Sequence, residues 1–380
     1  MNEKDIAEIR RRFKPEKCNI THVCGCYVND KKEIVSQFDQ PFLDLPQDET
    51  EKLLAVLKRA LSGTVGKNLI DIKFATKQVV NSEEHQLLTA LRDTKLQDPV
   101  FVEGFYGRVI DALRMEGSYL ILLAYDTYDV PFYGKDGEKD DFSSEVFSYV
   151  LCAVCPVKET KPALCYYVPE NTFHNLQPDW LVSPPELGFM FPAFEDRAAN
   201  IYGAWYYTRN TAENHKEFVD AVFNTEIPAP AEIQKETFTT ALGDTLGDEC
   251  DLEVVQAVHH RMVEMIEEHK ADKDSEPPAV SKRMVKTLLN SCGVSEEKIS
   301  AFEERYDDVF GADATVPPQN IIDAKQFEVK TPDVTIKVNP ERSDLVQTRI
   351  INGARYILIR ADEGVEVNGV NIRISPDELD

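Results

Sequence analysis

The chain has 380 residues, of which 42% are hydrophobic, and its formal net charge is −25. Such an acidic surface repels nucleic acid and anionic lipid unless a local basic patch intervenes. The longest apolar run, residues 119–125, is much shorter than the roughly 18 residues of a membrane span, so we expect no membrane partner. A chain of this length predicts two or three folded domains.

The N-terminus and the cysteines indicate the compartment. Residues 1–17 are charged throughout and lack the apolar stretch of a signal peptide. The eight cysteines lie within apolar stretches rather than at the regular spacing of a small disulfide-linked domain. We therefore predict a cytoplasmic protein with reduced cysteines.

The first 225 residues predict an α+β domain, with a mixed sheet and flanking helices. One helix carries Ile6, Ile9 and Phe13 on a single face. A second helix begins at Asp48, which we expect to cap it, and a later helix is capped by Asp98. Apolar strand patterns occupy residues 19–30, 33–38, 68–74, 119–130, 144–157, 163–168, 186–194 and 201–208.

The remainder of the chain predicts two further parts. Residues 226–312 form a helical region, with a charged, proline-containing linker at residues 272–278. Its 3.6-residue apolar periodicity predicts helices at residues 231–243, 251–270, 281–291 and 295–310. Residues 320–380 predict a small β module, in which Asn352 and Gly353 separate two alternating runs and indicate a β-hairpin.

The segment LSGTVGKNL, residues 61–69, resembles a phosphate-binding loop because a glycine-rich turn ends in Lys67. A Walker-type loop follows a strand, opens a helix and has a hydroxyl residue after its lysine. Here a helix precedes the loop, a strand follows it, and Asn68 occupies the hydroxyl position. We interpret the segment as a helix cap at Gly63 followed by a turn.

Four cysteines would be a sufficient set of zinc ligands: Cys24, Cys26, Cys152 and Cys155. The alternation places Cys24 and Cys26 on one strand face, together with Ile20, whereas Cys152 and Cys155 point to opposite faces. We therefore predict buried, reduced thiols in neighbouring strands of one sheet, without a metal, and keep a zinc site as the alternative.

A helical acidic face is a weaker candidate for a metal site. His260 and Glu264 lie one turn apart on the predicted helix at residues 251–270, with Glu267 and Glu268 nearby. The zinc-hydrolase signature His-Glu-x-x-His is absent from this helix. We interpret these side chains as a solvated helix face.

Among the patterns in the sequence, carboxylates at strand ends most resemble a catalytic site. Asp126 and Asp129 end one apolar strand, and Glu195, Asp196 and Arg197 follow another. If the two ends converge, they could bind Mg²⁺ for phosphoester hydrolysis. Strands often end in polar residues for structural reasons alone, so we predict no cofactor, and Mg²⁺ applies only to this enzyme alternative.

Positive charge is concentrated in the first fifth of the chain. The strongest candidates for anion binding are Arg11, Arg12, Lys58, Arg59 and Lys67. A local basic patch can bind RNA or phosphate in spite of the net charge. No aromatic and glycine signature of an RNA-binding module accompanies these residues, so we favour ordinary surface charge.

Several stretches are together distinctive, among them ITHVCGCYV, LSGTVGKNLIDIKF, YLILLAYDTYDVP, LCAVCPV, GFMFPAFEDR and FEVKTPDVTIKVNPERSDLVQTRIING. They resemble an uncharacterised family of low-GC Gram-positive bacteria, known as domain of unknown function 4317. The resemblance covers nearly the whole chain. It implies a bacterial cytoplasmic protein and transfers no catalytic residue.

Three functions follow as hypotheses. The absence of catalytic motifs, the acidity and the modular composition favour a non-enzymatic binding or regulatory protein, with another protein as its partner. The first alternative is a metal-dependent phosphoesterase or nuclease that uses the strand-end carboxylates. The second is an RNA-associated or ribosome-associated protein that uses the N-terminal basic residues.

Overall fold

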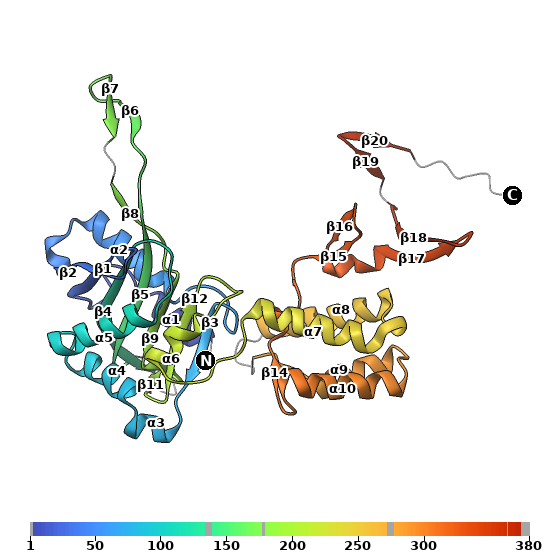
Figure 1. The fold of residues 1–380 in the computed structure, drawn as a ribbon, viewed down its shortest axis with the longest axis horizontal. Coiled ribbons are helices and arrows are strands. Elements are labelled where there is room, and N and C mark those ends of the chain that lie inside the picture. The colour runs from blue at the N-terminus through green and yellow to red at the C-terminus, as the bar shows by residue number, and fades with distance from the viewer. Residues whose placement is uncertain (1–2, 134–138, 177–178, 272–276, 363, 374–380) are drawn as a thin grey trace. The chain divides into compact units, whose positions relative to one another are not determined.

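The alternating strands of the N-terminal part pair into one eight-stranded sheet (Figure 1). Its order is β2 (Ile34–Pro41), β1 (His22–Val28), β4 (Tyr119–Tyr133), β5 (Lys139–Glu159), β9 (Leu187–Phe191), β12 (Gly203–Thr208) and β3 (Leu69–Lys73), and β8 (Trp180–Val182) also pairs with β5. Every pair runs antiparallel. The predicted α+β class is confirmed, although the strand directions within this sheet are not mixed.

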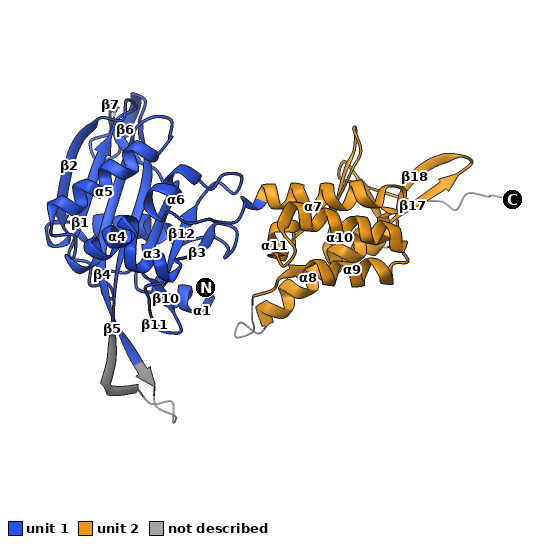
Figure 2. Cartoon of the chain, turned by 60° about the horizontal axis from the view of Figure 1, so that its bottom comes forward, with its two compact units in different colours: residues 1–231 blue, residues 232–380 orange. Residues whose placement is uncertain are grey.

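The computed structural model describes residues 3–133, 139–176, 179–271, 277–362 and 364–373. Its contacts divide the chain into two units, residues 1–231 and residues 232–380 (Figure 2). The predicted first boundary, at residue 225, lies close to this division. The predicted boundary between residues 312 and 320 falls inside the second unit, and the predicted linker at residues 272–278 lies largely outside the described residues.

Helices cover both faces of the sheet and create two core layers in the first unit. Buried residues of α1 (Glu3–Arg10) and α2 (Gln47–Arg59) form one layer with the sheet. Buried residues of α4 (Glu83–Asp93), α5 (Pro99–Ala112) and α6 (Lys216–Val222) form the other, and α3 is the short helix Thr76–Asn81. Strand β5 is central, because Cys152 belongs to one layer while Cys155 belongs to the other.

Two predicted helix details need correction, and one is confirmed. Helix α2 begins at Gln47, and the carboxylate of Asp48 pairs with Lys52 instead of capping the helix. Phe13 is buried as predicted, but α1 ends at Arg10. Asp98 caps α5, since its side chain accepts a hydrogen bond from the Val100 amide at 3.0 Å.

The segment at residues 163–168 forms a strand but does not join the sheet. Strand β6 (Ala163–Tyr167) pairs with β7 (Thr172–Leu176) in a two-stranded ribbon, which we call the arm, residues 163–176. Figure 1 shows this ribbon extending beyond the strands of the sheet. A second small ribbon pairs β10 (Ala193–Glu195) with β11 (Ala198–Asn200).

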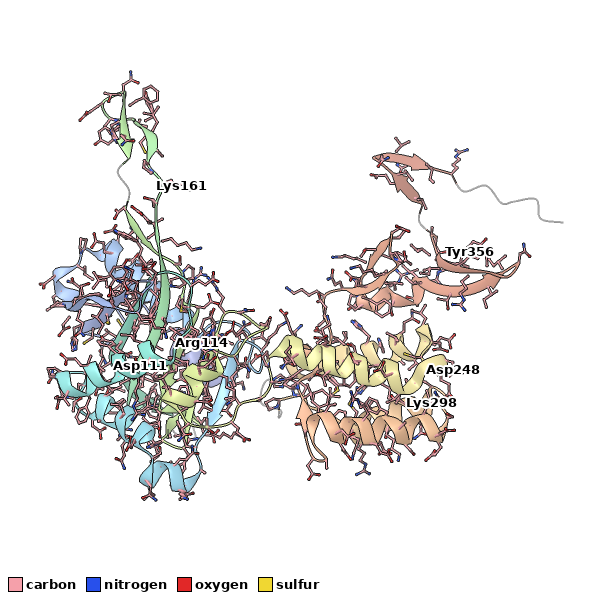
Figure 3. The ribbon with its side chains drawn as sticks, viewed as in Figure 1. Asp111, Arg114, Lys161, Asp248, Lys298 and Tyr356 are labelled. Carbon is pink, nitrogen blue, oxygen red and sulfur yellow. The ribbon has the colours of Figure 1, made fainter. Side chains whose placement is uncertain are left out.

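The second unit begins with helices around a core of its own. The helices are α7 (Ala231–Leu246), α8 (Leu252–Ala271), α9 (Lys282–Ser291), α10 (Glu296–Phe310) and the short α11 (Pro318–Ile321). For the four helices that were predicted, each observed end lies within three residues of the predicted end. Phe238, Met262 and Phe302 are among the buried residues that join them, and Lys298 pairs with Asp248 at 3.5 Å at the surface (Figure 3).

Short strand pairs complete the second unit. They are β13 (Val280–Ser281) with β14 (Thr315–Val316), β15 (Phe327–Lys330) with β16 (Thr335–Val338), β17 (Val346–Ile351) with β18 (Ala354–Ile359), and β19 (Val365–Val367) with β20 (Val370–Ile372). The hairpin predicted at Asn352 and Gly353 is confirmed, because both residues have positive φ and Ile351 pairs with Ala354. Within the described residues, we find no helix with the length and apolar character needed to cross a membrane.

Candidate functional site

Asp126, the leading candidate for a catalytic carboxylate, is buried and fully engaged by its own chain. Its Oδ1 accepts hydrogen bonds from the amides of Asn19 (2.8 Å) and Thr127 (2.9 Å), and its Oδ2 accepts one from the Tyr149 hydroxyl (2.7 Å). The Arg12 guanidinium lies 3.6 Å from Oδ2. Burial nevertheless raises the pKa of Asp126 above its ordinary value, against these contacts. The arrangement is that of a structural anchor.

Two of the other four candidate residues, Asp196 and Arg197, contact helix α1 rather than Asp126. Arg197 donates hydrogen bonds to Glu8 (2.9 Å) and to the carbonyl of Pro131 (2.7 Å). The Asp196 amide donates to Asp5 (3.1 Å), and Glu195 accepts from Asn200 at 2.6 Å. Asp129 is exposed on β4. Across the part of the chain that the structure describes, no three of these carboxylates lie close enough to share one ion.

Sequence reasoning missed Asp5, which lies near the carboxylates of Glu8, Glu195 and Asp196. Its side chain is 5% exposed. Burial raises the pKa of Asp5, and the nearby charges of Asp196, Glu8 and Glu195 raise it further, although the hydrogen bond from Asp196 opposes this. The one sequence signal for the burial of Asp5 is its position beside Ile6 and Ile9, whose side chains are also buried on α1. The cluster holds α1 against the β10–β11 turn.

The glycine-rich loop at residues 61–69 uses its polar groups internally. The amides of Lys67, Asn68 and Leu69 all donate to the carbonyl of Thr64, and the Gly66 amide donates to the carbonyl of Leu69. The side chain of Arg10 hydrogen-bonds the carbonyls of Leu61 and Gly63. Because the amides face partners in the loop itself, they form no cradle for a phosphate. Gly63 has the positive φ, +84°, that its predicted cap position requires.

The candidate basic residues have different surroundings. Arg12 is mostly buried, donates to the carbonyl of Thr127 at 2.8 Å and lies 4.2 Å from the centre of the Tyr128 ring. It therefore fastens the segment after α1 to β4. Arg11, Lys58 and Arg59 are exposed, and Lys67 is half-buried.

The four cysteines lie in one sheet but do not gather around one point. Cys24 and Cys26 are on β1 and Cys152 and Cys155 on β5, and because β4 lies between these strands, the predicted placement in neighbouring strands is wrong. Strands two positions apart are separated by about 10 Å, which exceeds the reach of two thiolates bound to one zinc ion. Cys24, Cys26 and Cys152 share one core layer and Cys155 faces the other. Ile20 also faces that other layer, unlike the prediction.

These four thiols should resist modification in the native protein. Burial raises the pKa of Cys24 to about 12, of Cys26 to about 11 and of Cys155 to about 12, so the reactive thiolate is scarce. We expect slow alkylation by a polar reagent at these positions and fast alkylation at Cys165, which is half-buried on the arm. Mass spectrometry of timed samples measures the rates. Equal native rates at Cys152 and Cys165 would contradict the expectation, and labelling in denaturant is the control.

The acidic face of α8 is neutralised by its own neighbours. His260 is 62% exposed and lies 3.1 Å from Glu264, while Arg261 pairs with Glu264 at 3.0 Å and with Glu268 at 3.4 Å. Glu267 pairs with a lysine one turn later. Exposed pairs of this kind are typical of a solvated helix face.

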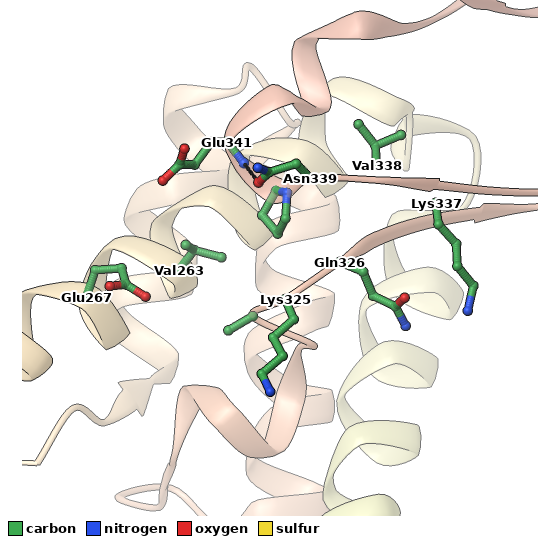
Figure 4. Close-up of a pocket in the computed structure, with 10 residues that line it drawn as sticks. Val263, Glu267, Lys325, Gln326, Lys337, Val338, Asn339 and Glu341 are labelled. Atoms are coloured by element: carbon green, nitrogen blue, oxygen red, sulfur yellow. Dashed lines mark hydrogen bonds between the residues drawn. The ribbon is translucent and has the colours of Figure 1, made fainter. Parts of the chain in front are cut away.

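A groove in the second unit lies between α8 and the segments around β15, β16 and the turn η3 (Pro340–Leu345) (Figure 4). Its volume is about 550 Å³. Two lysines and two glutamates supply its charges: Lys325, Lys337, Glu267 and Glu341. Because these charges balance, the groove gives no indication of the charge of a ligand.

The arm is a second feature that sequence reasoning missed, because the apolar pattern at residues 163–168 predicted a strand of the main sheet. Leu164 is 73% exposed, Tyr166 50% and Phe173 68%. Tyr166 pairs with Phe173 across the ribbon, with ring centres 5.2 Å apart, and Leu164, two residues away, lies on the same face. We call these three side chains the apolar face of the arm. Figure 3 shows side chains along the ribbon and labels Lys161 just before it.

The arm also carries unpaired backbone and almost no charge. Among the described residues, β6 and β7 pair only with each other, so each has an outer edge whose amides and carbonyls have no strand partner there. Residues 163–176 contain Glu170 and neither lysine nor arginine. An isolated two-stranded ribbon is at best marginally stable in water. A protein strand added to one edge would pair with the backbone of that edge, and other residues of the same protein could cover the apolar face.

Comparison with known sequences agrees with the resemblance seen in the motifs. The sequence model of the family described as Domain of unknown function (DUF4317) matches residues 1–370. No curated protein matches the chain. The family description contains no activity, substrate or partner, so function must be argued from the residues themselves.

Proposed function

Since the chain belongs to the DUF4317 family, whose description names no activity, we propose its function from its own geometry: a non-enzymatic binding protein of the bacterial cytoplasm that engages another protein through the arm. The apolar face of Leu164, Tyr166 and Phe173 carries this proposal, because large exposed apolar side chains next to an open strand edge are typical of an interaction site.

The chemistry of the arm favours a protein over the other partners. Nucleic acid is held mainly by lysine and arginine contacts to phosphate, and the arm has neither residue. Elsewhere, Arg10 and Arg12 already bond within the first unit. The engagement of Asp126 by Asn19, Thr127 and Tyr149 likewise gives less support to the phosphoesterase alternative. We propose that the partner adds a strand to the arm and covers its apolar face.

Site-specific photocrosslinking in cells tests this proposal. A photoreactive amino acid replaces Leu164 in one variant and Leu43, which is 98% exposed on the body of the same unit, in the control variant. We expect one discrete protein adduct at position 164 that is absent at position 43. Identical adducts at both positions, adducts only to nucleic acid, or sedimentation of the purified chain with lipid vesicles would count against a protein partner.

The captured protein must then bind the purified chain. In the double variant Tyr166→Ser with Phe173→Ser, we expect at least about 30-fold weaker binding, because a buried aromatic hot spot contributes about 2 kcal/mol or more. Isothermal titration calorimetry measures the affinity, and Leu43→Ser is the matched control. Both arm residues are exposed, so the thermal unfolding midpoint should hardly change. Unchanged affinity in the double variant would refute the assignment.

A further inference from the structure

Three potential metal ligands converge where β1 and β2 pair. Across the residues that the structure describes, His22, Cys24 and Asp39 are the one set of three or more His, Cys, Asp and Glu side chains whose ligand atoms all lie within 4.8 Å of one another. The backbone explains the convergence. His22 and Cys24 are two apart on β1 and therefore share a face, and Asp39 lies directly opposite Cys24 on β2.

The histidine is prepared for coordination. Its Nδ1 lies 3.1 Å from the Thr21 hydroxyl, and its Nε2 is buried and has no hydrogen-bond partner among the residues that the structure describes. When Nδ1–H donates to Thr21, Nε2 carries the free lone pair that a metal requires. A buried ring nitrogen without a partner is costly, and a bound ion would remove that cost.

The other two ligands differ in exposure. Cys24 is 6% exposed, and its sulfur lies a long 4.0 Å from the carbonyl oxygen of Leu96. Asp39 is exposed, and its charge is near enough to Cys24 to raise the pKa of that thiol, whose pKa is raised mainly by burial. The three side chains therefore extend from the core, at Cys24, to the surface, at Asp39, where solvent can reach them.

We propose that His22, Cys24 and Asp39 bind one Zn²⁺ ion. Zinc is the metal that combines thiolate, imidazole and carboxylate ligands, whereas Mg²⁺ and Ca²⁺ require mostly oxygen. One thiolate and one carboxylate balance the charge of the ion. Ligand atoms around tetrahedral zinc are about 3.5 Å apart, given bonds of about 2.0–2.3 Å, so separations of up to 4.8 Å need to shorten by about 1 Å when the ion binds.

Three protein ligands leave a fourth position for water or for a donor atom of a ligand. On binding, the Cys24 thiol releases its proton to solvent as the sulfur–zinc bond forms. Burial raises the pKa of the Tyr106 hydroxyl on α5 above its ordinary value, and the carboxylate of Asp39 raises it further. The oxygen of Tyr106 is also buried without a partner among the described residues.

Metal binding by the purified, metal-free full chain tests the proposal. Competition with a chromophoric chelator should show one tightly bound Zn²⁺ per chain. We expect Cys24→Ser and Asp39→Asn each to weaken the affinity at least about 100-fold, because even outer partners of ligands contribute 10–100-fold. Cys26→Ser is the matched control, since Cys26 is buried on the same strand face outside the set, and should bind as the original chain does.

Cobalt substitution reports on the ligands directly. Co²⁺ bound to the original chain should show a thiolate-to-cobalt charge-transfer band, which Cys24→Ser removes and Cys26→Ser keeps. Asp39→Asn should retain the band with weaker affinity, and its exposed position avoids any folding defect. No stoichiometric zinc, equal binding by all variants, or loss of binding only in Cys26→Ser would overturn the assignment.

Discussion

Replacement of Asp126 by alanine should destabilise the first unit by about 3–5 kcal/mol, the cost of leaving buried donors and a buried charge without their partner. The change leaves the amides of Asn19 and Thr127 and the hydroxyl of Tyr149 without their acceptor. It also leaves Arg12, whose side chain is 12% exposed, without a nearby carboxylate. Denaturant unfolding of the purified chain, followed by tryptophan fluorescence, measures the loss.

The matched variant Asp126→Asn keeps an oxygen for the two amides. We expect it to cost only about 1–2 kcal/mol, since its amide group loses the contact with Arg12 and changes the bond with Tyr149. If Asp126→Ala left stability unchanged and abolished binding of Mg²⁺ instead, the structural assignment of this carboxylate would be wrong. The enzyme alternative would then regain support.

The pH dependence of this loss has a definite sign. Burial raises the pKa of Asp126 in the folded chain above the unfolded value of about 3.9. The folded state therefore binds this proton more tightly, and the contribution of Asp126 to stability is fully present in acid and falls as pH rises through the raised pKa. The difference in stability between the original chain and Asp126→Ala should accordingly be largest below about pH 3.9.

The sequence pattern correctly predicted those strands, caps and turns that depend on residues close together in the chain. Apolar alternation located the strands of the sheet, and the two-sided apolar run at residues 144–157 correctly indicated a strand covered on both faces. Asp98 and the pair Asn352 and Gly353 were readable because a cap and a tight turn depend on a few adjacent residues. The start of α2 was missed because Pro46 takes the cap position before Asp48.

Features that depend on distant partners could not be predicted. Asp126 looked like a strand-end carboxylate until Asn19, more than 100 residues earlier in the chain, was seen to donate to it. Asp39 gave no signal because only strand pairing brings it opposite Cys24. The arm was misjudged for a different reason. An apolar sequence is usually buried within its own fold, whereas the apolar residues from Leu164 to Phe173 remain exposed to solvent.

A single added methyl group in the middle of the sheet should be nearly as damaging as the loss of Asp126. Gly188 lies on β9, between β5 and β12. A Cβ atom there would come within 2.4 Å of the backbone carbonyl oxygen of Cys152 and within 2.8 Å of the Cβ of Ala60, at the end of α2. Both obstacles belong to rigid elements, so we expect Gly188→Ala to cost about 3 kcal/mol through overpacking.

Gly104→Ala is the matched control, because it adds the same methyl group at an exposed position of α5, where no described atom outside the adjoining helix backbone lies within 4 Å. This change should stabilise the chain by about 0.5–1 kcal/mol, since alanine loses less backbone freedom than glycine in a helix. Denaturant midpoints of the two variants should therefore shift in opposite directions from that of the original chain. If Gly188→Ala unfolded at the original midpoint, α2 would not pack closely against β9, because a rigid contact at Ala60 leaves no room for the added atom.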